Sequence, residues 1–584
     1  MTRDYQLQNR GNKNISLREK RRNIMALSPE KALDVILSSD LPAELIQSFS
    51  EQDLYFLVHD IGLSDALPIL ALAHSEQWGY IIDMEIWTKD QLDLDSTTHW
   101  FKALLLADTK RMIRWLLSDR LEFLELYLFR NIEVIIREEN EDPSDFPDGF
   151  FTVDDYFYVR IKEKPEPLVA PDNNETISQD DLEEVVHEII NEIMAIDYYL
   201  YQEIMLEAMS VIAAETEEET FRLRNVRLAE KGFLPFDEAM EVYSPLEPDQ
   251  IGKKSVNRNP LSPMDPEWLP TPMAHVLEIK EQNLFSDSLE KLSDRIDLSD
   301  MEMEFASLCN QIIAAEQKTI RDKAMLSKIV KKAGSTISLG LEVLMDREGT
   351  TDPATRVGFM VNHSLKNLFR VGLGRIMGLK WQARKLIGDG WFGRQKLPLT
   401  FWGEHWTGVV GGLLVIRPVY YDNYLSGTLY RDFLSLEDIK HTERVLDDIR
   451  GFDELLSMMA PRMDDFKDFH LTCYNLIMTL WVHGKSGKKD DTEGPVIMDD
   501  VRLWFRDMVM PHNDDVENPK NNQGKKELLS WLSHRSGFTE EEISNRLGHA
   551  LEAMFQEFVN EYGSVHVDDL EARYITHLCI KSDL

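Results

Sequence analysis

The chain has 584 residues, of which 43% are hydrophobic, and a chain of this length can form about two to four domains or one long repeat-like body. Its 64 basic and 103 acidic residues give a formal net charge of −39. This excess of negative charge keeps a protein soluble and argues against nucleic acid or an anionic membrane as a general partner. Any basic binding surface must be local.

The cysteines and the apolar runs indicate the compartment. Cys309, Cys473 and Cys579 are far apart and odd in number, which suits neither a disulfide framework nor a Cys₄ zinc site. The basic N-terminus contains no signal-type apolar stretch. The longest apolar run, Val409–Ile416, is far shorter than the ~20 residues that a spanning helix needs. We therefore expect a cytoplasmic chain with no membrane span.

Apolar residues recur at i, i+3 and i+4 from residue 28 to about residue 130, which is the pattern of one helix face. The segments Ser50-Glu-Gln and Ser75-Glu-Gln repeat one type of helix entry 25 residues apart. Helices this short gain stability by stacking on one another, so residues 1–138 are expected to form a stacked array. The apolar triads are Leu33/Ile36/Leu37, Leu54/Leu57/Val58, Trp78/Ile81/Ile82, Phe101/Leu104/Leu105 and Met112/Trp115/Leu116.

The rest of the chain is also mostly helical, so the expected class is all-α with at most one small β-hairpin: an N-terminal stack followed by a larger irregular helical body. Acidic residues and prolines dominate an irregular connection, where 150–153 and 156–161 could pair as the hairpin. Five prolines exclude a helix from a later linker. The expected segments are 139–182 (acidic connection), 183–256 (helical hairpin), 257–272 (Pro-rich linker), 273–484 (helical domain), 485–526 (polar loops around a short helix) and 527–584 (C-terminal helices).

The predicted helical hairpin begins with a capping-box-like entry, Ser178-Gln-Asp-Asp181. We expect one long helix from there to about Ala214. A second helix would run to about Lys231 and be capped by Gly232.

Two family resemblances follow from particular stretches. Leu41-Pro-Ala-Glu-Leu-Ile-Gln-Ser-Phe followed by Ser50-Glu-Gln-Asp-Leu resembles the short-helix superhelical N-terminal domain of MgtE-type magnesium transporters over about a hundred residues. No transmembrane part follows it, so transport is not implied. The whole chain resembles an uncharacterised bacterial domain-of-unknown-function family of soluble helical proteins. The stretches that carry this resemblance are Glu51-Gln-Asp-Leu-Tyr-Phe-Leu, Phe221-Arg-Leu-Arg-Asn-Val-Arg-Leu-Ala-Glu-Lys-Gly-Phe, Asp237-Glu-Ala-Met-Glu-Val-Tyr and Tyr430-Arg-Asp-Phe-Leu-Ser.

The sharpest local departure from the acidic composition lies between His363 and Lys396, where eight basic residues accompany one acidic residue, Asp389. Aromatic residues are interleaved with them. Such a segment could bind an acidic partner or a nucleic-acid backbone, with the aromatics available for stacking. Internal pairing or a solvated face is the alternative. The candidate partner-binding residues are Lys366, Arg370, Arg375, Lys380, Trp381, Arg384, Lys385, Arg394 and Lys396.

The glycines of the same segment, Gly372, Gly374 and Gly378, do not match the dinucleotide fingerprint and follow no strand. A phosphate-binding loop needs that strand, because the strand positions a helix N-terminus against the phosphate. Close helix packing is the preferred interpretation.

Three other pairs of polar or titratable residues have the spacing of a metal site or of a catalytic acid/base pair. Glu184-x-x-His187 has di-iron spacing but occurs once, and His470-x-x-Cys473 provides only two of the four ligands of a zinc site. We therefore interpret the first as an exposed pair and the second as core residues. Trp402-Gly-Glu-His-Trp406 could hold an acid/base pair if a cleft exists, or be a turn anchored by two tryptophans. We expect no catalytic residue, metal or cofactor.

The leading functional hypothesis is therefore an intracellular helical interaction or scaffold protein with protein partners, because stacked helices present extended surfaces. One alternative is a regulator that responds to a ligand or divalent cation, with the carboxylates of residues 139–184 as loose ligands. The other is an enzyme of unrecognised type with a site between the two halves.

Overall fold

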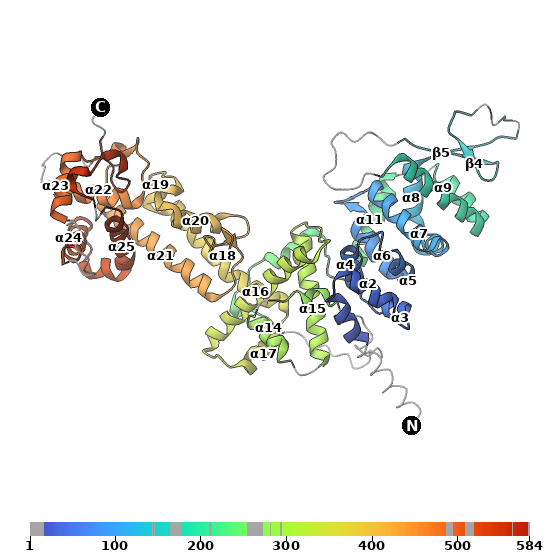
Figure 1. Ribbon diagram of the computed structural model, residues 1–584, viewed down its shortest axis with the longest axis horizontal. Coiled ribbons are helices and arrows are strands. Elements are labelled where there is room, and N and C mark those ends of the chain that lie inside the picture. Colours follow the sequence, from blue (N-terminus) through green and yellow to red (C-terminus); the bar gives the residue numbers. More distant parts are fainter. Residues whose placement is uncertain are drawn as a thin grey trace, which may run out of the picture. The chain divides into compact units, whose positions relative to one another are not determined.

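The computed structural model describes residues 17–139, 141–142, 144, 146–163, 177–209, 213–253, 272–280, 282–292, 295–485, 494–508, 519–562 and 565–581. The chain divides into two compact units, and Figure 1 shows their elements. Unit 1 comprises Met1–Ser244, Ile251–Ile337 and Glu348–Arg370, and unit 2 comprises Pro245–Gln250, Ser338–Arg347 and Val371–Leu584. Helices dominate both units, which confirms the mainly all-α class. The segment predicted at 273–484 contributes to both units.

Unit 1 begins with short helices at the positions of the apolar triads. Alternate helices pack on one another, because α4 contacts α2 and α6, and α5 contacts α3 and α7. Asp108 interrupts α7 with a non-helical backbone, so the last two triads belong to two helical parts of one element. The elements are α2 (Pro29–Leu37), α3 (Pro42–Gln47), α4 (Glu51–Ile61), α5 (Leu67–Leu72), α6 (Ser75–Glu85), α7 (Leu94–Asp119) and α8 (Leu121–Asn131).

The two similar helix entries use different caps. Ser50 caps α4, where its hydroxyl accepts the backbone N–H of Asp53 at 3.1 Å. At the second entry the cap is His74, one residue before the serine, and its imidazole accepts the N–H of Gln77 at 3.2 Å. The Gln77 side chain accepts the N–H of His74 in return, which completes a capping box.

In the part of the chain that the structure describes, the strands form three small antiparallel sheets rather than a single hairpin. The predicted β-prone stretches are β4 (Phe151–Thr152) and β5 (Phe157–Ile161), and β3 (Ile132–Ile136) joins them in the order β3-β5-β4. Sequence reasoning missed β3 because its residues directly follow α8 and continue the apolar pattern of that helix. The other pairs are β1 (Trp87–Thr88) with β2 (Gln91–Leu92), and β6 (Tyr420–Tyr421) with β7 (Tyr430–Arg431).

The prediction of one long helix from residue 178 to about 214 is wrong. Helix α9 (Gln179–Ile196) ends at Asp197, whose backbone is extended, and α10 (Tyr198–Glu207) begins directly after it. The Asp197 carboxylate accepts the backbone N–H groups of Tyr199 and Leu200, at 3.0 and 3.1 Å. An aspartate that caps a new helix competes with continuation of the old one.

Helix α11 (Ala213–Ala229) is anchored by a buried ionic cluster. Arg227 donates two hydrogen bonds of 2.7 Å to the carboxylate of Asp83, which is 3% exposed. Arg120 contacts the same carboxylate, and Arg224 donates to the Asp83 carbonyl oxygen at 2.6 Å. Burial lowers the pKa of Arg224 to about 10. These contacts join α6, α7 and α11, so their cations serve internal packing.

A second buried carboxylate of unit 1, Asp53 of α4, holds the start of a helix that is distant in the sequence. Asp53 accepts the backbone N–H groups of Met273 and Ala274, at 2.9 and 2.8 Å, at the start of α13. The elements of this part are α12 (Phe236–Ala239), η2 (Met240–Tyr243), α13 (Ala274–Leu277), α14 (Leu284–Glu290), α15 (Arg295–Ala315) and α17 (Pro353–Asn362), with α16 (Lys323–Glu348) and α18 (Leu365–Asp389) extending into unit 2. The linker predicted at 257–272 lies outside the described residues except for residue 272.

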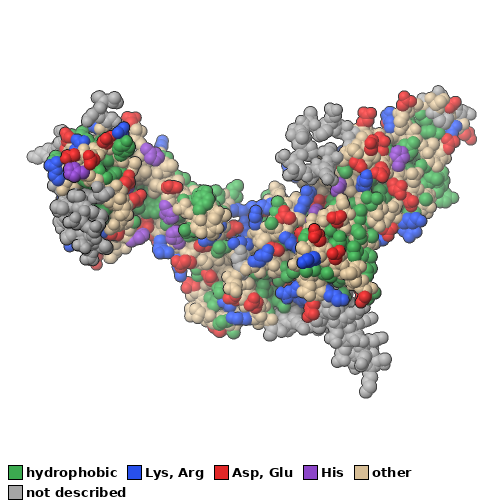
Figure 2. All heavy atoms as spheres, viewed as in Figure 1, with side chains coloured by type: hydrophobic (Ala, Val, Ile, Leu, Met, Phe, Trp, Pro, Cys, Tyr) green, Lys and Arg blue, Asp and Glu red, His purple; other side chains and the backbone are tan. Residues whose placement is uncertain are grey.

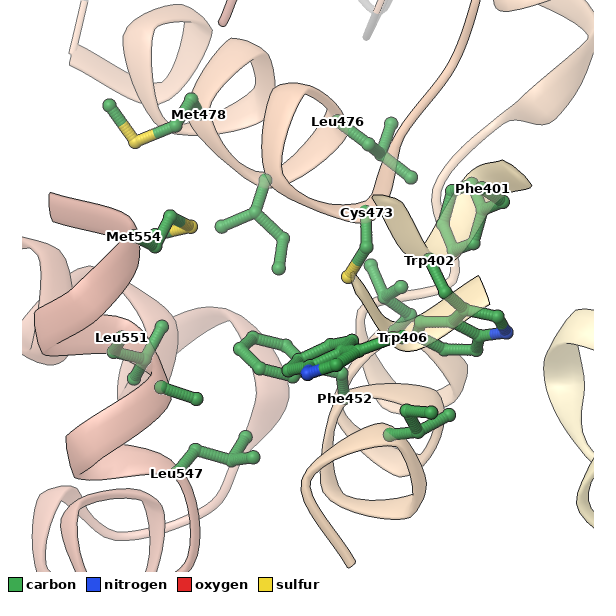
Figure 3. Close-up of a cluster of buried hydrophobic side chains, with 14 of the residues drawn as sticks. Phe401, Trp402, Trp406, Phe452, Cys473, Leu476, Met478, Leu547, Leu551 and Met554 are labelled. Carbon is green, nitrogen blue, oxygen red and sulfur yellow. The ribbon is translucent and has the colours of Figure 1, made fainter. Parts of the chain in front are cut away.

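Unit 2 is built around a large aromatic and aliphatic core. In Figure 3, Trp406 lies beside Phe452, near Cys473, and points toward the helix that carries Leu547, Leu551 and Met554. Trp402 lies on the other side of Trp406, next to Phe401. The elements are η3 (Pro248–Gln250), α19 (Trp391–Arg394), η5 (Leu399–Trp402), α20 (Gly403–Leu414), α21 (Leu436–Met459), η6 (Met463–Phe466), α22 (Cys473–Lys485), α23 (Met498–Met508), α24 (Pro519–Ser536), α25 (Glu540–Tyr562), η7 (Val567–Asp569) and η8 (Ala572–Tyr574).

Glycines on α20 create the seat for the β6–β7 hairpin. A Cβ atom at Gly408 would lie 2.4 Å from the ring of Tyr421, and one at Gly412 would lie 2.9 Å from the ring of Tyr430. The Tyr430 hydroxyl donates to the carbonyl of Gly408 at 3.1 Å. Gly408, which precedes the apolar run of residues 409–416, and Gly412 within it therefore let two tyrosines lie on the helix backbone. Within the described residues, no helix combines the length and apolarity needed to cross a bilayer.

One carboxyl group of unit 1 predicts a pH effect. Burial, reinforced by the charges of Glu207 and Glu122, raises the pKa of Glu125 from 4.5 to about 7. The folded protein therefore disfavours the ionised form, so this contribution to stability is full below pH 4.5 and is lost as the pH rises through 7. Glu125→Gln should raise the thermal unfolding midpoint at pH 8 and change it little at pH 4.5. The exposed Glu188→Gln on α9 is the control, and an equal shift at both pH values would contradict the assignment.

The hairpin seat predicts opposite effects for two glycines of α20. Gly408→Ala should lower the stability of unit 2 by about 1–3 kcal/mol, because the added methyl group overlaps the Tyr421 ring. A methyl group at Gly411 has no neighbour nearer than 3.7 Å, so Gly411→Ala should keep or raise stability through its better helix propensity. Thermal and urea unfolding of both variants check this, and similar behaviour of the two would show that the hairpin is not seated in this way.

Candidate functional site

A groove of about 520 Å³ lies in unit 2 beside the predicted basic segment. Helix α18 forms one wall, and the faces of α16 and α21 form the others. A short strap, Leu246–Pro248, closes one side. All of these lining residues belong to unit 2, so the groove is a property of one compact unit.

Helical periodicity explains how the three helices line the groove. From α18 come Val371, Gly374, Arg375, Gly378, Trp381 and Gln382; from α21 come Leu436, Ile439, Lys440 and Glu443; and from α16 come Val343, Asp346 and Arg347. Residues spaced three or four apart share one helix face. The beginning of α21 is also tied to the C-terminal part of α16, because the backbone N–H of Leu436 donates to the carboxylate of Glu342 at 2.8 Å.

Charges of both signs surround an apolar floor in the groove. Arg347, Arg375 and Lys440 face three carboxylates, those of Glu247, Asp346 and Glu443. Arg375 pairs with Glu443 at 2.9 Å, and its side chain stays 49% exposed. Arg347 pairs with Asp249, the residue that follows the strap. Exposed ion pairs of this kind contribute only about 0–1 kcal/mol each, so a ligand's charges could replace them at little cost.

The glycines of α18 shape the groove. A Cβ atom at Gly374 would lie 3.0 Å from the Leu246 carbonyl oxygen, so the glycine lets the strap, rather than another helix, approach α18. A Cβ atom at Gly378 would meet nothing within 4 Å, so its absence leaves open volume. Trp381, one turn further on, is 48% exposed at the groove.

The structure divides the predicted basic segment between two units. Lys366 and Arg370 lie in unit 1 and contact Glu241, at 2.7 and 3.6 Å. Arg394 donates to the carbonyl oxygen of Asp389 at 2.9 Å. The groove contains Arg375 and Trp381, while Arg384, Lys385 and Lys396 are exposed outside it.

Lys380 has a different role, because its side chain is 3% exposed. Its ammonium group donates to the carbonyl oxygens of Val415 and Ile416, at 2.6 and 2.7 Å. These carbonyls follow the last residue of α20, where a helix leaves acceptors unsatisfied and its dipole favours a cation. Burial, and secondarily the charge of Arg384, lowers the pKa of Lys380. The lysine therefore fixes the chain that leads into the hairpin.

An ionic network completes the hairpin. Arg431 donates to the carboxylates of Asp422 and Asp438, both at 2.7 Å, and the Asp422 carboxylate also accepts the N–H of Ser426 at 2.6 Å. The hydroxyl of Ser426, which donates to Asp422 at 2.7 Å, and then the Ser426 N–H and Arg431, lower the pKa of Asp422 against the opposing effect of burial. The loop between the strands is thus held by side chains as well as by backbone pairing.

The other predicted pairs occupy ordinary structural positions. Glu184 accepts a hydrogen bond from Lys102, while His187 stacks on Phe151 with ring centroids 4.0 Å apart. Cys473 is buried as expected, and burial raises the pKa of its thiol, whereas the expectation of a core histidine is wrong for the exposed His470.

Trp402 and Trp406 are buried in the core of unit 2, and the residues between them, Glu404 and His405, face outward. In the described part of the chain, no three His, Cys, Asp or Glu side chains come together as a metal site. The carboxylates proposed for residues 139–184 lie partly outside that description.

Sequence reasoning missed the other half of the groove. Lys440 and Glu443 lie one turn apart on α21, beside the apolar Leu436 and Ile439, and the basic segment alone gave no indication of them. The available signal was the i, i+3, i+4, i+7 mixture of apolar and charged residues at the start of that helix. Nothing in the sequence paired this face with α18.

Comparisons with known proteins place the chain in a family without giving it an activity. No curated protein and no solved structure matches it. A family model described as a family of unknown function, DUF6178, matches residues 9–581, which is nearly the whole chain. The chain therefore belongs to the DUF6178 family of unknown function.

Proposed function

We propose that the chain is a helical interaction protein whose unit 2 groove binds a segment of a protein partner. The observation that carries this proposal is the groove itself, in which an apolar floor, six charged side chains and an exposed tryptophan converge from three helices and a strap. A groove between helix faces suits an extended or helical peptide with apolar anchors flanked by charges.

The exposed tryptophan supports a binding role. Trp381 keeps 48% of its surface accessible although the core of unit 2 buries other tryptophans almost completely. Tryptophan is enriched among the residues that dominate binding energy, because it offers a large rigid surface and one hydrogen-bond donor. A partner side chain that covers this ring would gain that energy.

The charge pattern supports a protein segment as the occupant. The groove balances three cations with three carboxylates, so it favours a ligand that carries both signs rather than a simple anion. Its polar side chains are ammonium, guanidinium, carboxylate and amide groups, which recognise charge and hydrogen-bonding partners. A peptide segment offers both, together with apolar anchors for the floor.

The open volume at Gly378 gives a direct test. Gly378→Leu should fill the groove without a clash, because nothing lies within 4 Å of the added Cβ. It should also keep or raise stability, since leucine is favoured over glycine in a helix by about 1 kcal/mol. Gly388→Leu is the matched control, because Gly388 lies on the same helix, also meets nothing within 4 Å and does not line the groove.

The measurement is capture of native partners by the tagged full-length chain, with wild type and both variants in parallel. A protein retained at a constant ratio by wild type and Gly388→Leu, and reduced at least tenfold by Gly378→Leu, supports the groove. A tenfold loss corresponds to about 1.4 kcal/mol of binding free energy. Two results contradict the proposal. Either the Gly378→Leu variant retains the partner as well as wild type does, or wild type retains no stoichiometric partner.

A further inference from the structure

A cavity of about 280 Å³ lies within unit 1 and is here called the α6 cavity. Helix α6 contributes Glu76, Gly79, Tyr80 and Asp83, which share one helix face because they are spaced three or four residues apart. The C-terminal ends of α7 and α11 form the other walls. Ligand pockets typically have volumes of about 300–1,000 Å³, so a cavity at the lower end of this range suits a small molecule.

The hydroxyl of Tyr80 is an unsatisfied polar group in the wall of the α6 cavity. Tyr80 is 7% exposed and lines the cavity, and its hydroxyl has no hydrogen-bond partner in the described part of the chain. Burial, reinforced by the charges of Glu51 and Asp53, raises the pKa of this hydroxyl, so it keeps its proton and can donate. A buried hydroxyl without a partner is unfavourable, and an acceptor atom of a ligand would remove that cost.

The guanidinium group of Arg120 is a second donor in the inner wall, because Gly79 leaves room for it. A Cβ atom at Gly79 would lie 2.7 Å from an Arg120 nitrogen and 3.9 Å from the Trp115 ring. In the described chain, Arg120 makes only two long hydrogen bonds, of 3.2 and 3.4 Å, to the carboxylate of Asp83. A guanidinium group has five N–H donors, so Arg120 retains donors for a ligand.

Asp83 does not neutralise the guanidinium groups around it. Arg227 donates two hydrogen bonds of 2.7 Å to its carboxylate, Arg120 contacts the same group, and Arg224 donates to its carbonyl oxygen. One carboxylate therefore faces three cations. Asp119 is exposed and acts on Arg120 through its charge, without a hydrogen bond. The inner wall of the α6 cavity thus presents hydrogen-bond donors and positive charge.

The rim of the α6 cavity has the opposite charge. Of the charged side chains that line the cavity, five are carboxylates and three are cations. Glu51 pairs with Lys231 at 3.0 Å, and Glu76 lies 2.9 Å from the imidazole of His74. Figure 2 shows that Asp and Glu side chains lie among Lys and Arg side chains on the visible face of unit 1. The exposed carboxylates of the rim are Glu76, Asp119 and Glu230.

We propose that the α6 cavity binds a free α-amino acid, with its carboxylate on Tyr80 and Arg120 and its ammonium group at the carboxylates of the rim. A simple anion would have to pass these carboxylates, and a simple cation would meet the guanidinium group inside. An amino acid carries both charges in the required order. Its carboxylate would form charge-assisted hydrogen bonds with the inner donors, and Trp115, which is 5% exposed, would contact its side chain.

Isothermal titration calorimetry of the full-length chain with the standard amino acids, one at a time at millimolar concentration, identifies the ligand. At least one of them should bind. Two analogues of that amino acid then serve as probes: the amine that lacks the carboxylate and the acid that lacks the amino group. Each analogue should bind about tenfold more weakly or less, because it loses the charged group that one layer of the cavity recognises.

Tyr80→Phe tests the inner wall, because it removes only the hydroxyl. This hydroxyl has no partner in the described protein, so the variant should keep or raise the thermal unfolding midpoint without ligand. Its affinity for the amino acid should fall about tenfold, as expected for a hydrogen bond to a charged group. Tyr201→Phe is the matched control, since the Tyr201 hydroxyl is also buried without a partner but lies outside the cavity, and this variant should bind as wild type does.

Asp119→Asn with Glu230→Gln tests the rim. Both side chains are exposed, so the variant should fold. It should bind the amino acid more weakly than wild type does, and bind the analogue without the amino group as well as or better than wild type does. Glu188→Gln with Glu218→Gln is the control, because these exposed carboxylates lie outside the cavity, and it should bind as wild type does.

Three results overturn the proposal. The first is that no amino acid binds, and the second is that Tyr80→Phe binds the amino acid as tightly as Tyr201→Phe does. The third is that the amine analogue binds as tightly as the amino acid, which would make the α6 cavity a site for an ammonium group alone. The cavity lies in unit 1 and the groove in unit 2, so failure of either proposal leaves the other standing.

Discussion

The hydrogen bonds from the buried Lys380 ammonium group to the carbonyls of Val415 and Ile416 are the interaction on which the placement of the β6–β7 hairpin in unit 2 depends. They close the end of α20 and set the direction in which the chain enters the hairpin. The same helix, α18, presents Gly374, Gly378 and Trp381 to the groove. Helix α18 therefore has two roles. Its buried Lys380 holds the exposed residues Val415 and Ile416 in place, and other residues of the helix line the groove.

Lys and Arg side chains are scarce in this chain, and several of them stabilise the fold from the inside. With 64 basic residues against 103 acidic ones, many positive groups of the described chain hold buried carboxylates or carbonyls in place. Arg227 binds Asp83, and Arg431 binds Asp422 and Asp438. Removing one partner of a buried pair of this kind typically costs about 3–5 kcal/mol. Exposed cations such as Arg384 stand out because they lack such a partner.

Local pattern predicted much of the fold. The apolar triads gave the helices of the N-terminal part, and the capping box at Ser178 gave the start of α9, because these features depend on neighbours within a few residues. The break at Asp197 was missed, since an aspartate in a helical pattern can either face solvent or cap a new helix, and packing decides between them.

The groove of unit 2 was only partly predictable from the sequence, because packing between distant segments decides which residues line it. The basic segment drew attention to α18, but its charges belong to two units and its most buried member binds carbonyls 35 and 36 positions away. Gly408 and Gly412 of α20 seat Tyr421 and Tyr430, and nothing in the sequence around these glycines indicates that role. Contacts between distant segments decide such roles, and no periodicity within either segment encodes them.

Amide hydrogen exchange on Lys380→Met tests the central role of the lysine most directly. The account predicts faster exchange in residues 412–431 of the variant, because the carbonyls of Val415 and Ile416 lose their hydrogen-bond donor. Exchange in α25, which packs in the core and does not contact Lys380, should stay as in wild type. Exchange in residues 412–431 that matches wild type would contradict the claim that Lys380 holds these residues in place.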